Sequence, residues 1–147
     1  MARLNCPLLG MPFVLVEKNG KLVSYMPGVT NKEEPTPLLL KAKQELEEYQ
    51  RGERKSFDIP FDPPVTNFAK RMYKELLKVG FGETITYGEL AKRLNQKGAR
   101  GVAAALHVNH IILFIPCHRV VAKNGLGGFG IGDHVKKLLL EHEAKYK

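Results

Sequence analysis

The stretch Ile111-Ile112-Leu113-Phe114-Ile115-Pro116-Cys117-His118-Arg119-Val120-Val121 organises the rest of the chain. Its apolar run is stopped by Pro116, and a cysteine, a histidine and an arginine follow before apolar residues resume. This pattern predicts a buried strand or extended segment that delivers one thiol into a polar, cationic setting.

Cys117 is therefore the first candidate for a reactive group. A free cysteine titrates near pH ~8.5, so little thiolate exists at neutral pH unless a base or a positive charge favours it. His118 and Arg119 are the nearest candidates for that help, and each unit of pKa depression needs about 1.4 kcal/mol of preference for the anion. The alternative is that Cys117 is a small buried hydrophobe, which is the usual fate of a lone intracellular cysteine.

The charge of the chain is concentrated in its second half. The 147 residues carry a net charge of +8, enough chain for one domain or two small ones. Residues 1–65 hold nine basic and nine acidic side chains, whereas residues 66–147 hold fourteen basic and six acidic ones. This asymmetry indicates that the C-terminal half binds a polyanion, and a merely soluble basic surface is the alternative.

The two cysteines, Cys6 and Cys117, lie far apart and form no Cys-x-x-Cys pair, so neither a disulfide framework nor a zinc site is expected. Every histidine lies beyond residue 100, which leaves Cys6 without a local ligand set. The first ten residues lack a long apolar core, and no run approaches the ~20 apolar residues of a membrane span. We expect a soluble cytoplasmic protein with no metal and no membrane partner.

The N-terminal part, residues 1–62, is predicted to be a small structural α/β domain. Asn19-Gly20 between two apolar-rich runs, 13–17 and 22–26, predicts a β-hairpin. Leucine, alanine and tyrosine spaced three or four apart predict a helix over 37–50. Residues 56–59 could form one more strand, and the proline-rich residues after them are the expected linker.

The C-terminal part, residues 63–147, is predicted to be mostly helical, which makes the whole chain an α+β protein. Residues 65–79 form an amphipathic pattern with apolar residues on one face. Thr86 and Glu89 fit a capping box that begins a helix reaching Leu94, and a second helix is expected over 99–108. Two short helices joined by a glycine-containing turn in a basic region indicate a helix-turn-helix, although many such pairs bind nothing. A last helix is expected over 133–146.

The second helix of that pair has an unusual composition, because Arg100 stands among very small side chains that include Gly101, Ala103 and Ala104. Small residues allow a helix to approach a nucleic-acid groove or a neighbouring helix closely. The alternative for Arg100 is a surface ion pair with Glu89.

Glu143 falls on the apolar stripe of the last helix, with Val135, Leu138, Leu139, His142 and Tyr146. Carboxylates are rarely buried without a partner. Glu143 is therefore either half of a structural ion pair or a functional carboxylate that orients His118, which is the interpretation we favour.

Taken together, Pro116-Cys117-His118-Arg119-Val120, the preceding apolar run and Asn109, the glycine-rich stretch 124–132 and the terminal helix resemble the active-site signature of the O6-alkylguanine-DNA alkyltransferases. The resemblance covers about residues 65 to 145. Phe129 stands where a tyrosine is common, which keeps stacking but loses a hydroxyl, and Ile131 and His110 also depart from the family pattern.

This resemblance implies a reaction and a set of roles. Cys117 would accept an alkyl group from O6 of guanine in double-stranded DNA, after nucleotide flipping, in one turnover and without a cofactor; O4 of thymine is a further possible target. No obligate protein partner is implied. The implied catalytic residues are Cys117, His118 as proton acceptor, Glu143, Tyr87 as donor toward the base and Asn109 as a brace. Arg100 would replace the flipped nucleotide, and the other implied DNA contacts are Gly101, Ala103, Ala104, Thr86 and Arg119. The implied base pocket is formed by Val120, Phe129 and Gly130.

Three other functions remain open from the sequence. A non-catalytic protein of the alkyltransferase-like kind would bind the lesion without reacting, but such proteins lack the reactive cysteine. A helix-turn-helix regulator would leave the Pro-Cys-His-Arg motif without a purpose. A cysteine hydrolase would not need the basic helix pair.

Overall fold

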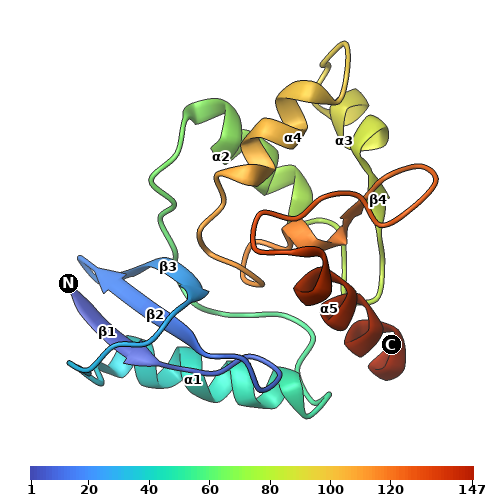
Figure 1. Cartoon of the computed structure of the whole chain (residues 1–147). Coiled ribbons are helices and arrows are strands. Elements are labelled where there is room, and N and C mark those ends of the chain that lie inside the picture. The colour runs from blue at the N-terminus through green and yellow to red at the C-terminus, as the bar shows by residue number, and fades with distance from the viewer. The chain divides into compact units, whose positions relative to one another are not determined.

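The computed structural model describes all 147 residues, and its backbone divides into two units. The first unit comprises Met1–Pro64 and His110–Phe114, and the second comprises Val65–Asn109 and Ile115–Lys147. The first contains a sheet and one helix, while the second is mostly helical (Figure 1). The predicted α+β class is confirmed.

The sheet of the first unit has three antiparallel strands in the order β1 (Ala2–Asn5), β2 (Phe13–Lys18) and β3 (Lys21–Pro27). The predicted hairpin is β2–β3, and both turn residues have positive φ, 53° at Asn19 and 75° at Gly20. That conformation is the one Asn-Gly adopts at low cost. Strand β1 was not predicted, because four residues are too few to show a convincing alternation.

Helix α1 (Pro37–Gln50) has the predicted bounds and lies along one face of the sheet (Figure 1). Its first turn is capped by Thr36, whose Oγ1 accepts a hydrogen bond from the Leu39 amide at 3.2 Å. Pro37 occupies the first helical position, where a missing N–H costs nothing. Burial of one helix stripe then closes the core of this unit, with Leu39, Ala42, Leu46 and Tyr49 on it.

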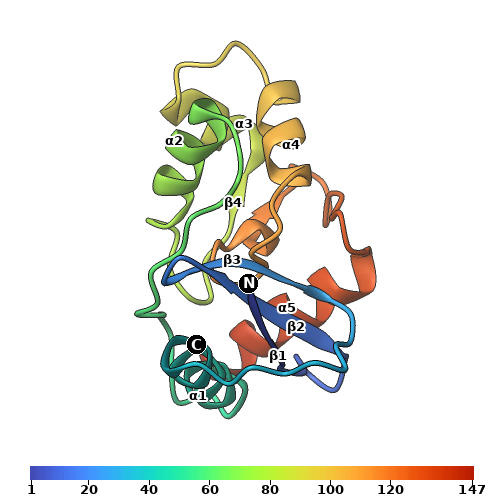
Figure 2. The same ribbon diagram turned by 90° about the vertical axis from the view of Figure 1, so that its left-hand side faces the viewer.

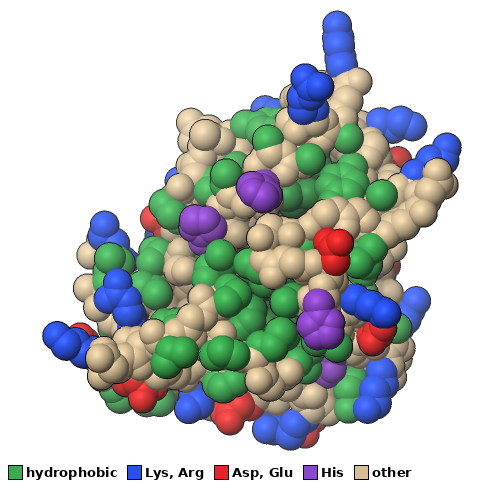
Figure 3. Space-filling view, in the orientation of Figure 1, with side chains coloured by type: hydrophobic (Ala, Val, Ile, Leu, Met, Phe, Trp, Pro, Cys, Tyr) green, Lys and Arg blue, Asp and Glu red, His purple; other side chains and the backbone are tan.

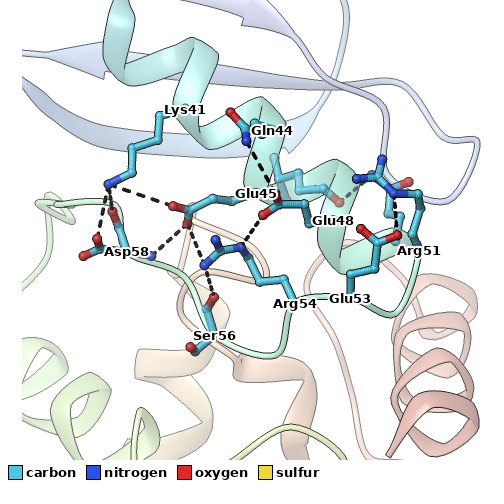
Figure 4. A network of polar contacts seen from close by, with 11 residues as sticks. Lys41, Gln44, Glu45, Glu48, Arg51, Glu53, Arg54, Ser56 and Asp58 are labelled. Atoms are coloured by element: carbon cyan, nitrogen blue, oxygen red, sulfur yellow. Dashed lines mark hydrogen bonds and ion pairs between the residues drawn. The ribbon is translucent and has the colours of Figure 1, made fainter.

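The segment after α1 forms no strand, so the prediction for residues 56–59 was wrong. A polar network holds this segment to α1 instead (Figure 4). Glu45 accepts a hydrogen bond from the Asp58 amide at 2.8 Å, and Arg54 bonds Glu48 at 2.7 Å. Pairing with the sheet is limited to a single bridge between Leu22 and Phe61. Prolines on both sides of Phe61 remove the N–H groups that a longer ladder would need.

The apolar run before the Cys117 motif is fully buried, as predicted, and part of it adds to the sheet edge of the first unit. The Tyr25 amide donates to the His110 carbonyl at 2.7 Å, and the Ile112 amide donates to the Tyr25 carbonyl at 3.1 Å. Leu113 then takes a positive φ of 76°, which ends this short extended segment.

In the second unit, helices α2 (Asn67–Leu76), α3 (Tyr87–Arg93) and α4 (Arg100–His107) pack on one another (Figure 2). The helix predicted over 65–79 is shorter at both ends: it begins after Thr66, which caps it by accepting a hydrogen bond from the Ala69 amide, and it ends at Leu76. Leu77, expected on the buried face, is 45% exposed because it lies past the last helical turn. Helices α3 and α4 form the predicted pair.

A two-residue parallel ladder holds the Cys117 motif beside the start of α3. Strand β4 (Ile85–Thr86) pairs with β5 (Val120–Val121), which directly follows the 3-10 helix η1 (Cys117–Arg119). Helix α5 (Asp133–Tyr146) has the predicted bounds and packs on η1. One detail of α5 was wrong: Leu138 is only half-buried, whereas Lys136 is fully buried.

Candidate active site

The Cys117 thiol begins η1 and is buried, with 4% of the residue exposed. The Asn109 side chain, which follows α4, donates from Nδ2 to Cys117 Sγ at 3.1 Å and to the Ile115 carbonyl at 3.3 Å. One amide group thus links the end of α4, the backbone before the motif and the sulfur itself. The sequence suggested only the bracing of the turn.

The fold favours the protonated form of the Cys117 thiol. Burial raises the pKa of Cys117 to about 11, and the hydrogen bond from Asn109 and the positive charge of Lys136 oppose that rise only in part. At neutral pH the resting side chain is therefore the neutral thiol. Arg119, one of the two candidates for lowering this pKa, is not among its main causes, because its guanidinium bonds other groups.

His118 is completely buried and is held by Glu143, with 2.7 Å between His118 Nε2 and Glu143 Oε2. Burial lowers the pKa of His118, with the Glu143 carboxylate acting against that shift, so the imidazole is neutral at pH 7. A neutral ring that donates from Nε2 leaves Nδ1 as an acceptor. Nδ1 is buried and has no hydrogen-bond partner.

Arg119 was expected to contact DNA, but the structure buries it and directs it inward, at 7% exposure. Its guanidinium bonds both oxygens of Glu143, at 2.9 and 3.0 Å, and the Val79 carbonyl at 2.8 Å. Burial alone would raise the pKa of Glu143, but the hydrogen bonds from His118 and Arg119 and the positive charge of Arg119 hold that pKa well below its usual range. Arg119 therefore anchors the carboxylate that orients His118.

A cavity of about 770 Å³ opens onto Cys117. This volume lies within the range of small-molecule sites. Figure 3 shows hydrophobic side chains on the surface between α4 and the loop before α5, and Lys and Arg side chains projecting near α3 and α4. The lining combines residues from α3, α4, η1 and the glycine-rich loop: Tyr87, Ala99, Arg100, Ala103, Leu106, His107, Cys117, Gly128, Phe129, Gly130 and Asp133.

The glycine-rich loop is fitted closely to Tyr87, whose hydroxyl donates to the Gly128 carbonyl at 3.1 Å. Gly127 has a φ of +77°, and a Cβ atom there would lie 2.8 Å from Tyr87 Cε2. Only glycine satisfies both the backbone conformation and this close approach. The loop therefore forms one wall of the cavity.

The remaining predicted site residues lie outside the cavity. Gly101 and Ala104 lie on the exposed face of α4, beside Arg100. The alternative ion pair between Arg100 and Glu89 is not formed, because no carboxylate lies within 4 Å of Arg100; Glu89 lies 3.9 Å from Arg93 instead. Thr86 caps α3 by accepting a hydrogen bond from the Glu89 amide at 3.1 Å. Val120 is buried in the β4–β5 ladder.

Lys136 is the main residue that the sequence interpretation missed. It lies next to Val135 on the α5 stripe, so its position on the helix was the available signal, but lysine is seldom fully buried. His107 and Asp133, which line the cavity, were also missed. No group of three or more His, Cys, Asp or Glu side chains could hold a metal ion. None of the helices has the length and apolar character needed to cross a membrane.

Comparison with known proteins agrees with this geometry. Residues 67–145 match the family profile described as 6-O-methylguanine DNA methyltransferase, DNA binding domain. A methylated-DNA–protein-cysteine methyltransferase of Methanosarcina acetivorans is 38% identical over 86% of this chain and 86% of its own length. The protein of the same name from Metallosphaera sedula is 46% identical over 68% of this chain and 64% of its own length.

Among solved structures, Mycobacterium tuberculosis OGT in complex with DNA superposes with a TM-score of 0.87 at 31% identity, covering 99% of this chain and 94% of that one. The resemblance inferred from the Pro116–Val120 motif is thereby confirmed. The chain belongs to the O6-methylguanine DNA methyltransferase family.

Proposed function

We propose that this protein repairs DNA by transferring an alkyl group from O6 of guanine to Cys117 Sγ in a single turnover. The observation that carries the proposal is the buried Cys117 thiol facing a cavity of about 770 Å³, next to a His118 whose Nδ1 is unpaired while its Nε2 is tied to Glu143. The names of the relatives, methylated-DNA–protein-cysteine methyltransferases, support it.

The DNA would meet the exposed face of α4. This face carries Gly101, Ala103 and Ala104, so the helix backbone can approach a groove, and Arg100 at its start is free to take the place of an extruded nucleotide. Flipping a guanine out of the stack costs a few kcal/mol, less for a mispaired base. Contacts from the basic side chains of this unit to phosphates would supply affinity that falls with salt.

The chemistry follows from the hydrogen-bonding roles of His118 and Glu143 beside the Cys117 thiol. His118 Nδ1 accepts the Cys117 proton through a water, and Glu143 stabilises the imidazolium as it forms. The thiolate forms a new S–C bond to the alkyl carbon while the C–O6 bond breaks, and its electron pair leaves with guanine. The proton taken from the thiol returns to the guanine, and the Tyr87 hydroxyl at the cavity wall can donate toward the ring once it releases the Gly128 carbonyl.

The product is a thioether, which water does not hydrolyse readily, so each protein molecule reacts once. The transfer needs no cofactor, because the thiol and the alkylated base supply every atom and electron pair that it uses. The location of the protein in the cytoplasm stays a prediction from the sequence.

Intact-mass spectrometry tests the proposal. The protein is incubated with a short duplex that contains O6-methylguanine, beside an unmodified duplex. We expect a gain of one methyl group, about 14 Da, with the modified duplex only, and restored guanine in the DNA.

Two cysteine variants make the result specific. Cys117→Ala should show no gain, whereas Cys6→Ala, which removes the other buried thiol, should gain the methyl group like the wild type. Tight binding of the modified duplex without any mass change would overturn alkyl transfer and indicate a lesion-binding protein.

A further inference from the structure

Tyr73 on α2 is a buried phenol that the reaction proposed above does not use. Only 2% of the residue is exposed, and its hydroxyl donates a hydrogen bond to the Ala105 carbonyl of α4 at 2.8 Å. Figure 1 shows α2 and α4 side by side, and the two helices pack on one another. Because a buried hydroxyl without a partner is costly, the carbonyl that it bonds indicates what the side chain holds in place.

The Ala105 carbonyl lies in the last turn of α4, where a continuing helix would bond it to the amide four residues later. That amide, of Asn109, donates to the Leu106 carbonyl at 3.1 Å instead, because the helix ends at His107. The last four carbonyls of a helix must find partners outside it. Tyr73 is such a partner for Ala105, so it caps the end of α4 from the neighbouring helix.

Little of α4 is buried. The helix has eight residues, its start receives no hydrogen bond from a capping side chain, and its buried residues are Val102 and Ala105. A helix of this length is marginal without tertiary packing. The hydrogen bond from Tyr73 is therefore a large part of what fixes the last turn of α4.

This last turn leads directly into the site. Leu106 and His107 line the cavity, and Asn109, two residues after the helix ends, donates from Nδ2 to Cys117 Sγ at 3.1 Å. The hydrogen bond from Asn109 opposes the effect of burial on the pKa of Cys117. Hydrogen bonds weaken steeply as their angle departs from linearity, so a small rotation of the last turn would weaken this support of the thiolate.

The Tyr73 hydroxyl is not itself a proton donor for the reaction. Burial raises the pKa of Tyr73, and the nearby Cys117 adds to that rise. The phenol therefore keeps its proton at neutral pH, and the hydroxyl donates that proton to the Ala105 carbonyl. Tyr87 is part of the cavity lining, whereas Tyr73 is not.

We propose that Tyr73 is a positioning residue of the alkyl-transfer site: its hydroxyl fixes the last turn of α4 and thereby holds the Asn109 side chain on the Cys117 sulfur. The expected effect on methyl transfer rests on the proposed function, whereas the expected effect on the thiol does not. This role adds α2 to the elements that position the nucleophile.

Two substitutions of the same kind separate positioning from stability. Tyr73→Phe removes the hydroxyl and keeps the ring. Tyr25→Phe is the matched control, because the Tyr25 hydroxyl is also buried and also donates to a backbone carbonyl at 2.8 Å, that of Cys6 in the first unit. Each substitution takes one donor from a buried carbonyl, so we expect similar shifts of the urea midpoint. A Tyr73→Phe protein that does not fold, beside a Tyr25→Phe protein that does, would overturn the proposal, since the hydroxyl would then support the whole unit.

The first measurement is the rate of Cys117 alkylation by iodoacetamide between about pH 7 and pH 10, where the rate rises with the thiolate fraction. Mass spectrometry of the Cys117 peptide reports the modification. We expect Tyr73→Phe to react roughly 3- to 10-fold more slowly than the wild type, because the thiolate loses part of its hydrogen bond from Asn109, and Tyr25→Phe to match the wild type. An unchanged or faster rate in Tyr73→Phe would overturn the proposal. No DNA is present, so this result decides even if the wild type fails to transfer a methyl group.

The second measurement is single-turnover methyl transfer from an O6-methylguanine duplex at saturating DNA, in a double-mutant cycle with Asn109→Ala. We expect Tyr73→Phe to lower the maximal rate by about 5- to 20-fold, and to have little further effect once Asn109 is replaced, because both changes act on the same hydrogen bond. Rate losses that multiply would show that Tyr73 does not act through Asn109 and would overturn the proposal, as would an equal loss in Tyr25→Phe. Should Asn109→Ala not fold, the thiol rates of Tyr73→Phe and Tyr25→Phe decide.

Discussion

Two carboxylates of this protein, one in each unit, are almost equally buried but differ in their partners. Glu45 on α1 is 3% exposed and Glu143 on α5 is 1% exposed. The cations near Glu45 reach it from solvent, since the side chains of Lys41 and Arg54 are 50% and 31% exposed and lie 4.0 and 3.8 Å away (Figure 4). Glu143 instead bonds two buried side chains at 3.0 Å or less.

Burial of a carboxylate does not by itself make its ion pair important for stability. An exposed cation can rehydrate when its partner is lost, so such pairs contribute ~0–1 kcal/mol. A buried cation cannot, so removing its partner leaves an uncompensated charge in the interior. The network in the first unit therefore supports a loop, whereas Glu143 in the second unit fixes His118 and Arg119 together.

The largest expected effect comes from Glu143→Gln. It keeps the shape of the side chain but leaves the buried Arg119 without its counter-ion, and we expect the free energy of unfolding to fall by about 3–5 kcal/mol. Urea unfolding followed by circular dichroism measures this change. Glu141→Gln is the control, because that carboxylate is exposed on the same helix; equal effects of the two substitutions would contradict the comparison.

Acid should erase this difference between wild type and Glu143→Gln. Because the pKa of folded Glu143 is depressed, its contribution is complete above the unfolded value of about 4.3 and is lost as the pH falls from there through the folded pKa. Unfolding free energies of both proteins at pH 7, 5 and 3 should show a full difference at the first two values and a smaller one at pH 3. A constant difference would show that the charge of Glu143 is not what stabilises the fold.

A much smaller effect is expected for Glu45→Gln. The amide oxygen still accepts the hydrogen bond from the Asp58 amide, so the free energy of unfolding should fall by about 1 kcal/mol or less. Salt screening should reduce this loss further at 1 M NaCl, whereas the loss for Glu143→Gln should persist. Glu53→Gln, which breaks only the exposed pair with Arg51, should leave the urea midpoint unchanged. A salt-independent loss for Glu45→Gln would remove the distinction between the two networks.

Much of the fold could be predicted from local sequence. Helices α1 and α5 have the predicted bounds, because their apolar periodicity and their flanking residues agree. The β2–β3 hairpin follows from Asn19-Gly20, whose backbone conformation few other pairs adopt. Two further threonine caps, Thr36 and Thr66, were present in the sequence but were not recognised there.

The errors occurred where pairing partners are distant in the chain. The segment 56–59 has strand composition, but the prolines after it leave one bridge and no ladder. Strand β1 exists because β2 offers it an edge. The extended conformation before Pro116 was predicted, but its pairing with Tyr25 was not. None of these pairings leaves a local signal.

The nucleophile and its neighbours in the motif can be identified from local sequence, because a proline-stopped apolar run followed by Cys117, His118 and Arg119 is a local pattern. How the three side chains are used depends on the fold. His118 and Arg119 both turn to Glu143, so the guanidinium does not serve the thiol, and the cation that acts on Cys117 is Lys136, about two helical turns before Glu143 on α5. Charge interactions depend on distance through space and on burial, and neither is written in the order of the residues.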